Sequence, residues 1–264
     1  MTLRVPSRAT VVRSVLILIA GWGVLSTTAI GIFIITNEKN PDNRAIIKMG
    51  IALILIWCVL GGAIMVLLRD RFVAWANRIP VGWRTRFVLL CIAFAMIEEA
   101  VTTSLTNLAP LFGGITNAAR ITASKNYFEV IFLNSVIAFV PLFLCWGWLL
   151  SRYDFHPAEV LLLFGLNGTL AETLSFGPQN LIQVGMWVWV YGLMAYLPAC
   201  TVPEDRGVSP VKWWHWLMAV FLPLVFVIPL VLWLAWRAIK LSWRWARGRT
   251  PEEPLVPRNG SAAG

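Results

Sequence analysis

The sequence predicts an all-α protein, a polytopic bundle of transmembrane helices. Three observations support this fold class. Hydrophobic residues make up 58% of the 264 positions, charged residues make up only 13%, and the mean hydropathy is +0.72. Several apolar stretches reach about 20 residues, the length that a helix needs to cross the hydrocarbon core of a bilayer. Many of the 15 tryptophans lie near the ends of these stretches, where an amphipathic ring suits the headgroup region. We therefore expect an integral, multi-pass membrane protein embedded in the lipid bilayer.

The first two helices are expected at residues 15–36 and 46–68, separated by the polar loop NEKNPDNR. The connection that follows the second helix, RDRFVAWANRIPVGWRTR, carries five arginines. Loops rich in Lys and Arg stay on the cytoplasmic side of a membrane. This connection and the N-terminus are therefore both predicted to be cytoplasmic.

Two further helices are expected from about residue 87 and over residues 127–150. The third carries Glu98 and Glu99 directly after the uncharged run FVLLCIAFAMI. The fourth carries Glu129 near its start and Asn134 about one turn deeper. Both helices thus bring polar side chains to membrane depth.

The fifth apolar segment, residues 157–178, contains Asn167-Gly168 and Gly177-Pro178, which weaken a continuous helix. We predict that it is a broken or re-entrant segment, followed by spans at 181–197 and 213–236. This topology has six crossings and leaves both basic termini in the cytoplasm. In the alternative topology the segment crosses fully, giving seven crossings and an external C-terminal tail.

The C-terminal region carries a stripe of basic residues, spaced by three or four positions on one helix face: Arg237, Lys240, Arg244 and Arg247. With the interleaved tryptophans, the stripe predicts an interfacial helix that binds anionic lipid headgroups. The alternative is a solvated continuation of the last span. Residues 1–249 are expected to form a single transmembrane domain and residues 250–264 a flexible tail.

Intramembrane polar residues define the candidate site. A carboxylate at membrane depth costs roughly 2.5 kcal/mol or more on insertion scales unless it faces protein, water or a partner. If the helices pack together, a pocket for substrate or ion is expected from six side chains: Glu98, Glu99, Glu129, Asn134, Asn167 and Glu172. In the alternative, Arg120 and Lys125 fold inward and pair with the glutamates.

Carboxylates that share a site of low dielectric cannot all remain ionised, so such a pocket takes up a proton or shares a cation. The leading interpretation is a proton- or cation-coupled transporter or channel whose ligand is a proton, a cation or a cationic solute. In another interpretation, the protein is a noncatalytic membrane scaffold whose polar residues only hold the helices together.

The adjacent pair Glu98 and Glu99 resembles the first motif, EExxxR, of the CAAX-protease and bacteriocin-processing family of glutamate-dependent intramembrane peptidases. Thr103 occupies the position of the motif's arginine, and Ala219 stands four residues after His215, where the family's HxxxN motif has asparagine. The resemblance implies an intramembrane protease in which Glu98 or Glu99 is the general base. A nonenzymatic function is nevertheless the preferred interpretation.

Composition argues against other classes. The net charge of +9 is carried by residues beside the apolar spans, which favours membrane orientation over nucleic-acid binding. Four cysteines without CxxC spacing and two histidines predict no zinc site, haem, disulfide framework or other cofactor. A hard cation held by carboxylate and amide oxygens remains open.

Overall fold

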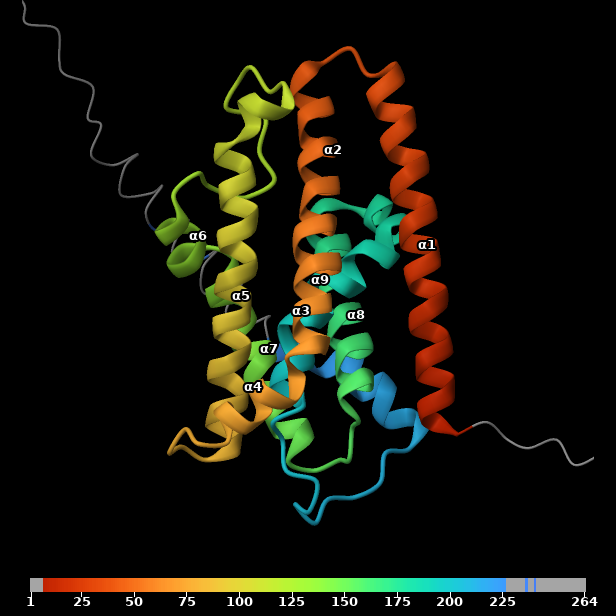
Figure 1. The fold of residues 1–264 in the computed structure, drawn as a ribbon, viewed down its shortest axis with the longest axis vertical. Helices are drawn as coiled ribbons and strands as arrows, with labels where there is room; N and C mark the ends of the chain where they lie inside the picture. The colour runs from red at the N-terminus through yellow and green to blue at the C-terminus, as the bar shows by residue number, and fades with distance from the viewer. Residues whose placement is uncertain (1–6, 227–235, 237–239, 241–264) are drawn as a thin grey trace, which may run out of the picture. The chain divides into compact units, whose positions relative to one another are not determined.

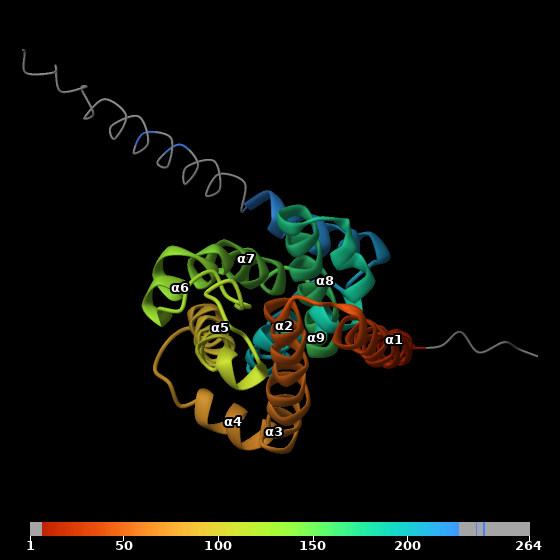
Figure 2. The same cartoon turned by 90° about the horizontal axis from the view of Figure 1, so that it is seen from above.

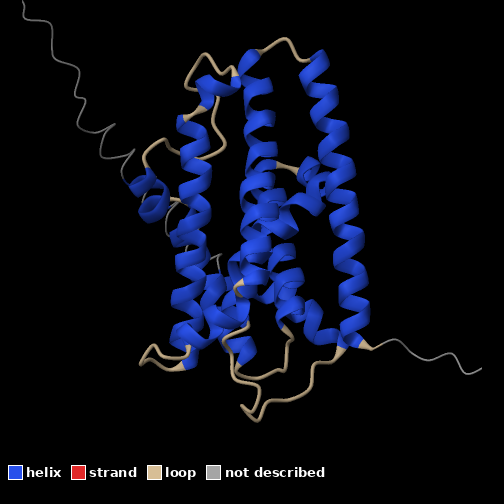
Figure 3. Ribbon diagram, in the orientation of Figure 1, coloured by secondary structure: helices blue, strands red, loops and turns tan. Residues whose placement is uncertain are grey.

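The computed structural model describes residues 7–226, together with 236 and 240. The chain divides into two compact units, Met1–Val227 and Ile228–Gly264, and the description below concerns the first unless stated otherwise. The described part of this unit is helical and contains no strand (Figure 3). The prediction of an all-α fold is therefore confirmed.

Five helical stretches are long and apolar enough to cross a membrane, as expected for a multi-pass membrane protein. A shorter apolar helix covers Trp213–Phe226. The predicted count of six crossings is not confirmed. The five stretches are Arg8–Asn37, Pro41–Leu67, Trp83–Asn107, Tyr127–Leu150 and Pro178–Ala199.

Helix α1 (Arg8–Asn37) starts earlier than predicted because the Ser7 side chain caps it by accepting a hydrogen bond from the Thr10 amide. In the turn after α1, the Glu38 carboxylate accepts hydrogen bonds from the Asn40 amide and the Asn43 side chain. These two donors hold the pKa of Glu38 below its usual value.

The next span begins with α2 (Pro41–Leu53), continues through a π-helical segment, η1 (Ile54–Gly61), and ends in α3 (Gly62–Leu67). A short helix, α4 (Arg69–Ala76), then runs sideways from α3 towards α5 (Trp83–Asn107) (Figures 1 and 2).

The predicted fourth helix is divided at Asn134 into α6 (Tyr127–Leu133) and α7 (Ser135–Leu150). Asn134 has φ −131° and ψ −103°, far from helical values. The Asn134 side chain donates instead to the Glu129 carbonyl oxygen, 3.0 Å away.

The predicted break at Asn167-Gly168 is wrong, because α8 (Pro157–Phe176) passes through both residues as one continuous helix. Glycine is needed at 168 for packing, since a Cβ atom there would lie 2.1 Å from the Tyr191 ring. The break at Gly177-Pro178 is confirmed. Gly177 has φ +108° and ends α8, and η3 (Pro178–Gln183) leads into α9 (Val184–Ala199).

Helices α8 and α9 form a close antiparallel hairpin. A Cβ atom on Gly165 would lie 2.3 Å from the Val188 carbonyl oxygen, and one on Gly192 would lie 2.5 Å from that of Leu161. Residues 157–178 therefore do not form a re-entrant hairpin by themselves. The chain turns back after α8 and returns through α9. Because α9 also contacts α1, η1 and α5, it forms the centre of the bundle (Figure 2).

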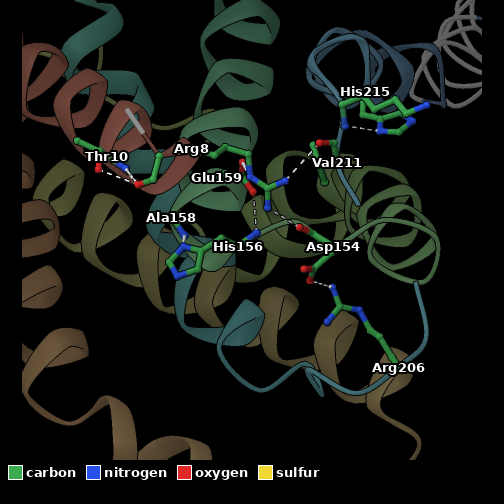
Figure 4. Close-up of polar contacts among 11 residues, drawn as sticks. Arg8, Thr10, Asp154, His156, Ala158, Glu159, Arg206, Val211 and His215 are labelled. Atoms are coloured by element: carbon green, nitrogen blue, oxygen red, sulfur yellow. Dashed lines mark hydrogen bonds and ion pairs between the residues drawn. The ribbon is translucent and has the colours of Figure 1, made fainter. Parts of the chain in front are cut away.

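Both ends of this hairpin lie at one end of the bundle, which we call the basic end after Arg8, Arg69, Arg86 and Arg206. The Nε atom of Arg8 lies 2.8 Å from the Glu159 carboxylate at the start of α8 (Figure 4). Arg86, at the start of α5, donates to the Thr201 carbonyl oxygen just after α9. The η3 turn lies short of the opposite end, where α1 meets α2 (Figures 1 and 3).

In the second unit, only Trp236 and Lys240 are described. The Nζ atom of Lys240 lies 5.1 Å from the centroid of the Trp236 ring. Arg237, Arg244 and Arg247, the domain boundary at 249 and the tail at 250–264 lie outside the described residues, so the lipid-binding stripe stays a prediction.

Candidate functional site

Glu98 and Glu99 lie in α5 and are both buried, with exposed fractions of 4% and 6%. Adjacent helical residues point about 100° apart, so one neighbouring helix could not cover both. Helix α5 packs against α7 and α9 as well as other elements, and this surround removes both side chains from the surface.

A third carboxyl group, from Glu172 of α8, joins them. The Tyr191 hydroxyl of α9 donates a hydrogen bond to Oε1 of Glu172. Glu98 and Glu99 both lie within electrostatic range of Glu172 and of Tyr191. We call these four residues the acid cluster. It combines groups from three helices that are separate in the chain.

Hydroxyl groups surround part of the acid cluster. Thr102 donates to Oε2 of Glu99 over 3.1 Å, and the Ser135 hydroxyl of α7 faces the same carboxyl group. By contrast, within residues 7–226 no hydrogen-bond donor reaches the Glu98 carboxyl group. Two further titratable groups are within electrostatic range of the cluster: Cys58 of η1 and Tyr127 of α6.

The acid cluster has no basic partner in the part of the chain that the structure describes. The three ion pairs found there are Arg8–Glu159, Arg69–Asp70 and Arg206–Asp154. The alternative in which Arg120 and Lys125 neutralise the glutamates is wrong. Arg120 donates to the Ala123 carbonyl oxygen, and Lys125 donates to the Asn117 side chain.

The structure does not bring Glu129 and Asn134 to the acid cluster. Glu129 is exposed and accepts a hydrogen bond of 2.6 Å from Ser124. Asn134 is also exposed. Because the chain breaks at Asn134, α6 lies at the periphery of the bundle and carries Glu129 outward (Figures 1 and 2).

Asn167 is fully buried, but its side chain is occupied by structural contacts. The Trp146 indole of α7 donates to its Oδ1 atom over 2.8 Å. Its Nδ2 atom donates to the carbonyl oxygens of Ala219 and Val220 in the helix Trp213–Phe226. Asn167 thus ties three helices together and does not offer free groups to a ligand.

Tyr191 is the member of the acid cluster that the sequence did not reveal. It lies in the aromatic run WVWVYG, where it resembles the interfacial tryptophans around it. The sequence signal for Tyr191 was Gly168, because the space left by the absence of a side chain there holds the Tyr191 ring. That signal has meaning only once α8 and α9 are known to pair.

Among the described residues, no group of three or more His, Cys, Asp or Glu side chains is placed to hold one metal ion. Comparison of the chain with family models, curated proteins and solved structures gives no match. The chemistry of the acid cluster is therefore the basis for a functional assignment. Carboxyl groups held together without a counter-charge bind protons more readily than isolated ones do.

Proposed function

We propose that the acid cluster is a proton-binding site and that the protein couples proton binding to transport across the membrane. The proposal rests on three carboxyl groups without a basic partner among the described residues: Glu98 and Glu99, buried in α5, and Glu172, which accepts a hydrogen bond from Tyr191 of α9. Carboxyl groups in a surround of low dielectric without a counter-charge favour the binding of a proton.

The proposed mechanism places the proton between α5 and the α8–α9 hairpin. With the proton bound, a carboxylic acid can share it with a neighbouring carboxylate through a hydrogen bond. When the proton leaves, like charges on α5 and α8 repel each other in a medium of low dielectric. Proton occupancy therefore shifts the packing of the hairpin against α5, which is the two-state element that transport requires.

Proton flux into proteoliposomes, followed with an enclosed pH-sensitive dye, tests the proposal. Glu98→Gln, Glu99→Gln and Glu172→Gln should each abolish most of the pH-driven flux and leave the helical content unchanged. The matched control is Glu129→Gln, which makes the same chemical change at an exposed position outside the cluster. Equal flux in the control and the cluster variants would contradict the proposal.

We also propose that the basic end, and with it the N-terminus, faces the cytoplasm, as the charge pattern predicts. Support comes from the arginines at this end, including those between α3 and α5. Single cysteines at positions 78 and 39, in a variant without the native cysteines, can be labelled with an impermeant thiol reagent in intact cells. Labelling at 39 and protection at 78 are expected. A reporter fused to the C-terminus tests the prediction that this terminus is also cytoplasmic.

A glutamate-dependent intramembrane peptidase is the second candidate. The observation in its favour is the burial of Glu98 and Glu99 side by side, as the resemblance to the CAAX-protease and bacteriocin-processing family requires. At the arginine position of that motif, the Thr103 hydroxyl is buried without a hydrogen-bond partner in the described region. Cleavage of a membrane peptide that is lost in Glu99→Gln would support this function. If the glutamine variants lose only stability, the scaffold interpretation is correct.

A further inference from the structure

The connection between α3 and α5 forms a predominantly positive surface at the basic end. Helix α4 runs sideways across this end, from α3 to α5, in both views of the fold (Figures 1 and 2). Within residues 69–84 the exposed arginines include Arg71, Arg78 and Arg84, and the large exposed hydrophobic side chains are Trp75 and Val81. We call these five residues the α4 patch.

The arginines of the α4 patch are not neutralised by neighbouring acids. Arg69, just outside the patch, pairs with Asp70 at 3.1 Å. No carboxylate of the described residues lies within 4.0 Å of Arg71, Arg78 or Arg84. The guanidinium group of Arg84 lies 5.5 Å from the centroid of the Trp83 ring. The patch therefore presents positive charge to its surroundings.

One apolar face of α4, next to the patch, packs against α5. Phe72 packs edge-on against Phe94 of α5, with ring centroids 5.6 Å apart, and Ala76 is fully buried. These contacts anchor α4 to α5 along one face. Trp75 stays 53% exposed and Val81 stays 38% exposed. An anchored helix that presents arginine and tryptophan together suits the boundary between headgroups and acyl chains.

The flanking residues place the patch at that boundary. Leu67, the last residue of α3, is 80% exposed, and Leu89, in the second turn of α5, is 53% exposed. Both belong to helices that are long and apolar enough to span a membrane, so their exposed side chains suit acyl chains. The unpaired arginines lie between these two apolar surfaces in the chain.

We propose that the α4 patch binds the phosphate groups of anionic phospholipids in the leaflet at the basic end. Guanidinium groups recognise phosphate oxygens through paired hydrogen bonds as well as charge, and the exposed Trp75 ring inserts among the headgroups. The surface between apolar spans favours a lipid over a soluble polyanion. This proposal is independent of the acid cluster and of proton transport.

The test measures which lipids stay with the purified full-length protein. The protein is equilibrated with an equimolar mixture of phosphatidylglycerol and phosphatidylcholine, and the bound lipids are then quantified by mass spectrometry. Wild-type protein should retain the anionic lipid several-fold over the zwitterionic one. The triple variant Arg71→Gln, Arg78→Gln, Arg84→Gln should lose most of this preference. The corresponding Arg→Lys triple, which keeps the charge, should retain part of it.

The matched control removes the same charge at the other end of the molecule, through Lys39→Gln, Arg44→Gln and Arg120→Gln. It should keep the wild-type lipid preference. If both triple variants lose the preference for the anionic lipid equally, only net charge matters and the proposal is overturned. An unchanged preference in the α4 triple variant also overturns it. If the α4 triple does not fold, the three single variants replace it, and each should lower the preference.

The source of the phosphate is tested separately by thermal unfolding. Phosphatidylglycerol should raise the unfolding temperature of the wild-type protein, whereas inorganic phosphate at the same concentration should not. Equal stabilisation by inorganic phosphate would assign the patch to free anions and overturn the lipid proposal.

Discussion

Asn167 of α8 donates a hydrogen bond to the carbonyl oxygen of Ala219, 3.2 Å away, in the helix Trp213–Phe226. Pro223 follows Ala219 by four residues and has no amide hydrogen, so this carbonyl has no helical donor. Asn167 supplies the missing donor and also reaches the Val220 carbonyl oxygen at 2.6 Å.

This relationship predicts a coupled effect of two substitutions. Asn167→Ala should lower the free energy of unfolding by about 1–3 kcal/mol, because it leaves a buried carbonyl oxygen unsatisfied. In a Pro223→Ala background the restored amide can bond to Ala219, so the same change should cost less. SDS titration in mixed micelles measures all four proteins. Additive effects within error would show that the two residues act independently.

Tyr191→Phe tests the hydroxyl that donates to Glu172. This donor stabilises the charged carboxylate more than the protonated acid, so its removal makes the carboxyl group hold its proton more tightly. The midpoint of pH-dependent flux should therefore move to higher pH in proteoliposomes. Tyr153→Phe is the control, because Tyr153 lies at the basic end beside His215. An unmoved midpoint in Tyr191→Phe contradicts the assignment of Tyr191 to the acid cluster.

Gly185→Ala should force α1 and α9 apart. A Cβ atom at 185 would lie 2.4 Å from the Gly23 Cα and 2.6 Å from the Ile19 carbonyl oxygen, both backbone atoms that cannot rotate away. Overpacking of this kind costs about 1–3 kcal/mol. Gly21→Ala serves as the control because nothing lies within 4 Å of its Cβ position, and alanine favours the helix. Thermal unfolding should separate the variants; equal unfolding temperatures would mean that α1 is not tightly packed on α9.

Arg8→Ala should release the start of α1 from the start of α8. Arg8 neutralises Glu159, which is only 1% exposed, and donates to the carbonyl oxygens of Asp154 and Val211 (Figure 4). Loss of these partners should lower the free energy of unfolding by about 1–3 kcal/mol. Arg13→Ala, at an exposed position on the same helix, should change it little. The cost of Arg8→Ala should fall in a Glu159→Gln background, and an undiminished cost would exclude the ion pair as its cause.

The sequence by itself determined the helical membrane class, because hydropathy and helix length are properties of short continuous segments. Local chemistry also located the end of α8, where Gly177 adopts a positive φ before a proline. The position of Glu98 and Glu99 at membrane depth was predictable for the same reason, since both follow a long apolar run within one helix.

Only the tertiary structure decided which polar groups meet. Asn167 was predicted to break its helix, yet its hydrogen bonds come from α7 and the helix Trp213–Phe226. Glu129 was assigned to the site by its predicted depth in the membrane, but the helix breaks at Asn134 and Glu129 is exposed. Tyr191 enters the acid cluster because α9 packs on Gly168 of α8. Partners of this kind depend on helices that are distant in sequence, and segment composition carries no record of which helices become neighbours.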